Sequence, residues 1–208
     1  MASALMHIAV AKEINEKLLH MNNEYLVGSI APDLAKLVGE PKKEGHFLRE
    51  SKDVPDLDYF LSLHDIKEPY NMGYFIHLLT DKIFFKDFLP KYYTKTQLKL
   101  ITGKYIELSS NEKIKLIYED YSSLNIILKK IYNLNLDFLN DNYNIKTDIS
   151  EVPADEINLL LNDVKKIVKT SEELPLNVFH KDEIIEFIET CVEEGIYAIS
   201  KQEQQIKS

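Results

Sequence analysis

Apolar residues recur every three or four positions along much of the chain. In residues 4–20, Ile8, Ala11 and Leu18 fall on one face, and this period predicts a helix with a buried stripe. His7 lies on the same stripe. The chain is therefore expected to open with a helix that directs an imidazole toward the interior.

The region after the first helix is predicted to turn. Gly28 and Pro32 mark a turn that opens into a short helix, "PDLAKLV", because glycine and proline end one element and begin the next. Residues 39–54 are mostly polar. We expect them to form a loop, with "GHF" in its middle.

Two helices are predicted before Pro90. The first, "DVPDLDYFLSLH", has Asp53 as a plausible N-cap and Pro55 in its first turn. Pro69 is expected to break the chain. The second helix, "NMGYFIHLLTDKIFFKDFL", is apolar nearly all round, which is typical of a central buried helix.

The second half of the chain reads as amphipathic helices. Ser109 and Glu112 stand in the register of a capping box, ahead of the segment "KIKLIYEDYSSLNIILKKIYNL", and two further helical patterns follow Pro153 and His180. No window alternates long enough to predict a strand. The expected fold is all-α: a single-domain helical bundle over 1–208, in which 1–90 hold the site and the helices of 91–208 complete the bundle.

Composition and charge narrow the function. The 208 residues are 45% hydrophobic, enough for a core, and carry a net charge of −9, so stable nucleic-acid binding is not expected. The single cysteine, Cys191, allows no internal disulfide.

No run of apolar residues reaches the length of a membrane span, and the first residues lack the basic start of a signal peptide. We expect a cytoplasmic protein without a transmembrane segment. Its oligomeric state is not predicted.

Histidines concentrate in the first part of the chain. Five of the six lie within the first 77 residues. His77 and Asp81 are four apart on the predicted buried helix, so their side chains share one face. They could bind one metal ion together, or His77 could be a hydrogen-bonded core histidine with Asp81 as its partner. Taken alone, His7 also fits a core histidine.

Four short segments resemble one family when they are taken together. "MHIAVA", "GSIAPD", "GHF" and "GYFIHLLTD" occur in this order over residues 5–90. In content and separation they resemble the zinc-dependent phospholipase C family. That family shares its all-helical fold with the fungal-type single-strand nucleases. Beyond residue 90 the resemblance is much weaker.

The resemblance implies a metal site in the first half. It makes the ligands of one zinc ion Asp33, His46, His77 and Asp81. It places His7 at a neighbouring ion, with Asp81 bridging the two and His64 as a further candidate ligand. One or two zinc ions are expected, although mixed His and Asp sites also accept other divalent transition metals.

The chemistry implied is hydrolysis of a small phosphoester by a metal-bound hydroxide. Asp33 is the candidate catalytic base as well as a ligand. Full members of the family hold three zinc ions and use an N-terminal tryptophan and later histidines. This chain has no tryptophan, and residues 82–179 contain no histidine. Ligands for a third ion are therefore not predicted.

Other interpretations of the same residues stay open. An HD-type phosphohydrolase would use as ligands His46, His64, Asp65 and Asp81. Alternatively, His64 ends a helix, where the dipole favours a histidine. His180 and Glu183 could be distant ligands, although their places at the start of the last helix also suit a cap. Finally, the chain could be a non-catalytic helical module that binds a metal or a partner.

Overall fold

The computed structural model describes the backbone of residues 2–50 and 53–207, with side chains through residue 202 and at 204. The described chain is mostly helical, as predicted, with one small antiparallel hairpin. The α-helices are α1 (Ala4–Ile14), α2 (Asn23–Gly28), α3 (Leu34–Val38), α4 (Lys42–Gly45), α5 (Leu57–Leu63), α6 (Pro69–Ile83), α7 (Ser110–Ile131), α8 (Ile157–Thr170) and α9 (Lys181–Lys207). The hairpin pairs β1 (Gln97–Lys99) with β2 (Tyr105–Glu107).

Short helices of other types extend or join these elements. The π-helical turns are η1 (Asn15–Leu19) after α1 and η3 (Phe84–Phe88) after α6. The 3₁₀ turns are η2 (Ala31–Asp33), η4 (Leu89–Lys91), η5 (Asp137–Asn140) and η6 (Ala154–Glu156). The two π-helical turns therefore continue the helices that the periodicity predicted over residues 4–20 and 71–89.

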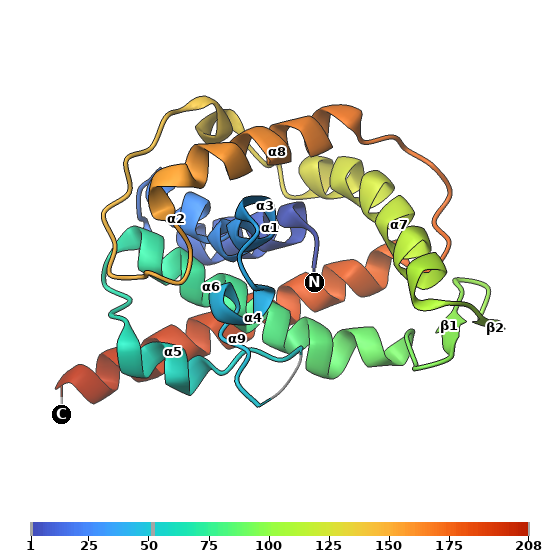
Figure 1. Ribbon diagram of the computed structural model, residues 1–208, viewed down its shortest axis with the longest axis horizontal. Coiled ribbons are helices and arrows are strands. Elements are labelled where there is room, and N and C mark those ends of the chain that lie inside the picture. Colours follow the sequence, from blue (N-terminus) through green and yellow to red (C-terminus); the bar gives the residue numbers. More distant parts are fainter. Residues whose placement is uncertain (1, 51–52, 208) are drawn as a thin grey trace.

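Helix α6 lies in the interior, as its composition predicted. Every residue from Tyr70 to Asp81 is buried. In Figure 1, α1, α2, α3 and α6 occupy the middle of the view, α8 passes above them and α9 below, and α7 and the hairpin lie at one side. Helix α1 contacts α6, α7 and α9. The first half of the chain is thus covered by helices from the second half.

Helices α2 and α6 approach each other unusually closely. A Cβ on Gly28 would overlap the backbone carbonyl of Tyr70, and a Cβ on Gly73 would overlap that of Tyr25. Only glycine allows two backbones to come this near. The contact brings the end of α2, with Ser29, against the middle of α6.

Several local predictions were wrong. Residues 39–54 are not only loop, because α4 forms over Lys42–Gly45. The N-cap of α5 is Asp56 rather than Asp53, and its side chain accepts the N–H of Tyr59 at 3.0 Å. Pro69 does not break the chain; it is the first residue of α6, where its missing N–H costs nothing. The hairpin was missed because its strands are only three residues long.

The capping box was predicted correctly. Ser109 Oγ accepts the N–H of Glu112 at 3.4 Å, and the Glu112 carboxylate accepts the N–H of Ser109 at 2.9 Å.

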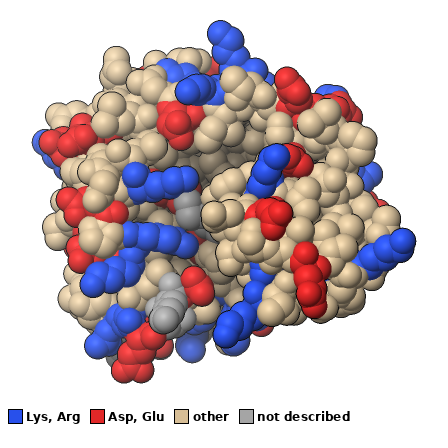
Figure 2. All heavy atoms as spheres, turned by 45° about the vertical axis from the view of Figure 1, so that its right-hand side comes forward, with Lys and Arg blue, Asp and Glu red and all other residues tan. Residues whose placement is uncertain are grey.

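No helix in the described part of the chain is long and apolar enough to cross a membrane. On the face shown in Figure 2, Lys and Arg side chains stand among Asp and Glu side chains, and the surface is hollowed near its middle.

Candidate metal centre

Five of the predicted ligands meet in one place. They come from α1, the 3₁₀ turn η2, the end of α4 and the second half of α6, and they are His7, Asp33, His46, His77 and Asp81. Four of their side chains are 0–2% exposed, and that of Asp33 is 13% exposed. Segments far apart in sequence thus bury three imidazoles and two carboxylates together.

Backbone carbonyls hold two of the imidazoles. His77 Nδ1 lies 2.9 Å from the carbonyl oxygen of Ser29, and His46 Nδ1 lies 3.2 Å from that of Lys42. A carbonyl oxygen can only accept, so each Nδ1 carries the proton and each Nε2 keeps a free lone pair. This arrangement, in which one ring nitrogen is anchored and the other is free, is usual for metal-binding histidines.

The turn that carries His46 is also held from outside. Phe47 has a φ of 51°, a left-handed conformation that costs a non-glycine residue about 1–2 kcal/mol. The ring of Phe47 packs edge-on against those of Phe60 and Tyr74. The Tyr74 hydroxyl donates to the carbonyl of Gly45. These contacts fix the direction in which the His46 ring points.

The free lone pairs face the carboxylates. His46 Nε2 lies 3.3 Å from Asp33 Oδ1 and 3.8 Å from Asp81 Oδ2. His77 Nε2 lies 4.0 and 3.8 Å from the same two oxygens. Two ligands about 2.0–2.2 Å from a tetrahedral ion stand roughly 3.3–3.6 Å apart, so these separations are close to those of a ligand set.

His7 lies on the other side of Asp81. Its Nε2 is 3.5 Å from Asp81 Oδ1, an oxygen that also accepts the N–H of Ala2 at 3.2 Å. The ring stacks on that of His77, with centroids 3.7 Å apart. The ligand atoms form two compact groups, one with His7, His77 and Asp81 and one with Asp33, His46 and His77. His77 belongs to both groups. Asp81 contacts both through its two oxygens, since Oδ1 lies by His7 and Oδ2 lies 3.8 Å from His46 Nε2.

Burial sets the protonation of these groups. It lowers the pKa of His77 to about 3, so the imidazole is neutral at pH 7. Burial opposes ionisation of Asp81 and Asp33, but attraction between each carboxylate and the neighbouring histidines in their protonated form outweighs burial and holds both pKa values below their ordinary range. Neutral imidazoles beside ionised carboxylates are the forms that bind metals.

Many atoms of the cluster have no hydrogen-bond partner. Within the described chain, the unpaired buried atoms at this place are His7 Nδ1 and Nε2, Asp33 Oδ1, His46 Nε2, His77 Nε2 and Asp81 Oδ2. Unpaired polar atoms are rare in protein interiors, since each costs about 1–3 kcal/mol. A cation among them would satisfy the lone pairs together.

The remaining candidates lie elsewhere. His64 is not in the cluster; its Nδ1 lies 3.2 Å from Asp148 and its Nε2 lies 3.3 Å from Glu151. The Asp65 side chain is 58% exposed and pairs with Lys67. His180 is exposed, and its N–H donates to Glu183 in the first turn of α9, as expected of a cap.

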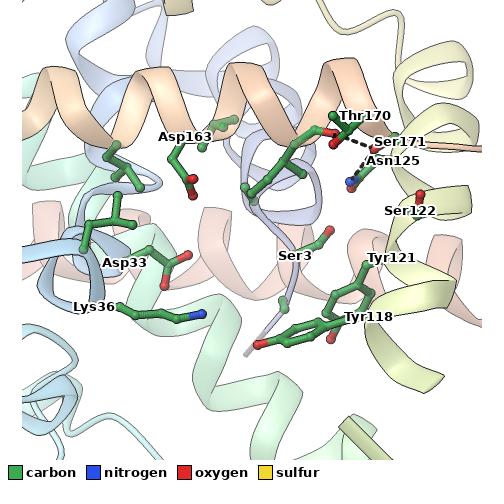
Figure 3. A pocket seen from close by; sticks show the side chains of 16 residues that line it. Ser3, Asp33, Lys36, Tyr118, Tyr121, Ser122, Asn125, Asp163, Thr170 and Ser171 are labelled. Atoms are coloured by element: carbon green, nitrogen blue, oxygen red, sulfur yellow. Dashed lines mark hydrogen bonds between the residues drawn. The ribbon is translucent and has the colours of Figure 1, made fainter. Parts of the chain in front are cut away.

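The second half contributes residues that the sequence did not single out. A cavity of about 350 Å³ opens beside Asp33. Figure 3 shows Asp163 of α8 and Tyr118 of α7 directed into it, with Lys36 of α3 extending across from the side of Asp33. Only for Lys36 does the sequence hold a signal, because it stands one helical turn after Asp33.

None of the family models, curated proteins and solved structures with which the chain was compared matches it.

Proposed function

We propose that this chain is a metal-dependent hydrolase of phosphoesters, with one or two divalent ions, zinc first among them, held by the buried cluster. One observation carries the proposal: three imidazoles and two carboxylates converge, and lone pairs on all five have no partner in the described chain. A bound divalent ion would polarise a phosphoryl oxygen and make a water molecule acidic near neutral pH.

The residues of the cluster would have separate roles. His46 and His77 would hold the ion through Nε2, because the carbonyls of Lys42 and Ser29 fix the opposite side of each ring. Asp81 contacts both candidate metal positions. Asp33 is the cluster residue that borders the cavity, so its carboxylate can orient an attacking water molecule and accept its proton.

The geometry favours this function over an HD-type phosphohydrolase. In that alternative, His64 and Asp65 would be adjacent ligands beside His46. Instead, the Asp65 side chain points to solvent and pairs with Lys67, and His64 lies between Asp148 and Glu151. The cavity at Asp33 also favours an enzyme over a closed structural site, since a catalytic site keeps an open position.

The test is hydrolysis of p-nitrophenyl phosphate and bis-p-nitrophenyl phosphate by zinc-loaded protein. Hydrolysis should disappear with a chelator and return with zinc. Asp33→Asn should lower kcat by about 10²–10⁴-fold, whereas Asp65→Asn, a matched change at an exposed carboxylate, should leave it unchanged. Hydrolysis that withstands the chelator, or that is lost equally in both variants, would overturn the proposal.

A further inference from the structure

The cavity beside Asp33 is enclosed by both halves of the chain. Its walls come from residues 2–4, α3, α7 and α8. Figure 3 shows α8 along one side, α7 along another and Asp33 on the side across from α7. At about 350 Å³ it has the size of a small-ligand pocket. A ligand in it would lie against the metal centre.

Most of the wall is apolar. The aliphatic part comes from α3 and α8, through Leu37, Leu160, Val164 and Ile167. The rings of Tyr118 and Tyr121 line the side of α7. Burial and the negative charges of Asp81 and Asp33 raise the pKa of Tyr121 well above its ordinary value, so its ring carries no charge. These walls suit an uncharged, apolar group.

Few charged side chains line the cavity, and each lies at a defined place in its wall. Lys36 is the one lysine or arginine among the described residues that line it. Figure 3 shows its ammonium reaching past the carboxylate of Asp33 into the open space. It forms no ion pair with another described residue, whereas Lys12 of α1 and Lys17 of η1 both pair with Glu13. Asp163 stands across from it on α8.

We propose that this cavity binds a small phosphoester with a single phosphate group and an uncharged apolar ester group, and that Lys36 is the residue that selects the anionic head. This inference rests on the proposed function, because the phosphoryl group would lie between Lys36 and the ions at Asp33. The ester group would lie along the aliphatic wall of α8. At about 350 Å³, the cavity matches an ester group of small-ligand size.

Asp163 adds a second element of selectivity. Its carboxylate faces the cavity from α8, so a second anionic group on the ligand would meet like charge at short range. A ligand with one phosphate, held near Lys36, avoids this repulsion. Lys36 and Asp163 together would thus select a ligand with one anionic group and would orient that group toward Lys36.

The test is isothermal titration calorimetry of zinc-loaded protein with phenylphosphonate and methylphosphonate. Neither compound carries an ester bond to hydrolyse. Phenylphosphonate should bind more tightly than methylphosphonate. Lys36→Met should weaken both by about tenfold or more, because a charge-assisted contact is lost. Ile167→Asp should remove the preference for the phenyl group. Lys166→Met, on α8 but outside the cavity, should change neither affinity.

Zinc content, measured on each variant, separates the two proposals. Zinc-loaded wild type that does not bind phenylphosphonate, or Lys36→Met protein that holds zinc and binds both compounds as wild type does, would overturn this inference and leave the metal centre standing. Wild type that holds no zinc would overturn the proposed function and this inference with it.

Discussion

The rings of His46 and His77 are each fixed by one backbone carbonyl, which leaves Nε2 of each facing Asp33 and Asp81. In each ring, one nitrogen is held by the backbone and the other is left free. This difference between the two nitrogens makes the cluster a candidate metal site rather than a hydrogen-bonded core network. In such a network the free nitrogens would find donors. Here they face carboxylate oxygens, which only accept.

Tyr74 tests how strongly the surroundings position His46. Tyr74→Phe removes the hydroxyl that donates to Gly45 and leaves a buried carbonyl without a partner. The free energy of unfolding should fall by about 1–3 kcal/mol, and zinc affinity should fall because the turn before His46 loosens. Chemical denaturation and zinc titration measure the two effects. Tyr197→Phe, at a side chain 66% exposed, should change neither; if Tyr74→Phe behaves likewise, the hydroxyl does not position His46.

Spacing in the sequence predicts some of the cluster residues and others not at all. The spacing of His77 and Asp81 predicted a shared face of α6, and the structure has it. Asp33 and His46 lie in turns, where no periodicity applies, and only a resemblance singled them out. His64 was expected near the metal but pairs with Asp148 and Glu151, since partners some 85 residues away are not visible in a local pattern.

At the scale of elements, the site depends on the close approach of α2 and α6. Gly28 and Gly73 allow the two backbones to meet, and the contact brings Ser29 to His77. The sequence predicted both helices but not their contact, because glycine in a helix signals several things other than close packing.

Gly73→Ala should separate these helices. Its Cβ would overlap the backbone of Tyr25, which cannot yield as a side chain can. We expect a loss of about 1–3 kcal/mol in stability together with weaker zinc binding, measured by denaturation and titration. Gly195→Ala is the control, because its Cβ would meet only side-chain ends of Ile14 and Ile76. Equal effects of the two changes would contradict a special role for the α2–α6 contact.

A second element-scale contact joins the connection before α8 to α5 and α6. Asp148 receives a hydrogen bond from Asn71 at 2.6 Å, and His64 Nδ1 lies 3.2 Å from its other carboxylate oxygen. Burial opposes ionisation of Asp148, but these two partners outweigh it and lower its pKa below 3.8. A carboxyl whose pKa is lower in the folded state stabilises the fold above its unfolded pKa, and this contribution is lost as the pH falls further.

Asp148→Asn should therefore lower Tm at pH 7. The difference from wild type should shrink as the pH falls below about 3.8, where the wild-type carboxyl becomes protonated. Thermal unfolding across this pH range measures it. Zinc content should not change, because His64 and Asp148 lie outside the cluster. A Tm difference that is constant with pH would mean that the ionised carboxylate is not what holds the connection.

At the scale of the whole molecule, the two halves contribute different parts. The first half supplies the five candidate ligands, and α7 and α8 of the second half line the cavity beside Asp33. Periodicity predicted the helices of the second half and the all-α class. It could not predict which face of α8 covers Asp33, because that depends on contacts over more than a hundred residues of chain.

Metal removal should destabilise the molecule as a whole. Removal of the ion would leave the buried carboxylates and imidazoles without a shared cation. A bound ion present at about 100 times its Kd stabilises the fold by roughly 3 kcal/mol, and this contribution would be lost. For a chain of this size that corresponds to about 5–10 °C in Tm. Thermal unfolding with chelator and with added zinc checks this. An unchanged Tm would argue that the described cluster is stable without an ion.

The most direct test of the central claim is the metal content of protein purified without a histidine tag, measured by mass spectrometry of the digested sample. Wild type should hold about one or two equivalents of a divalent transition metal, His77→Ala should lose it, and His64→Ala should retain it. Wild type that holds no metal even after refilling with zinc, or a metal lost with His64 but kept without His77, would contradict the account.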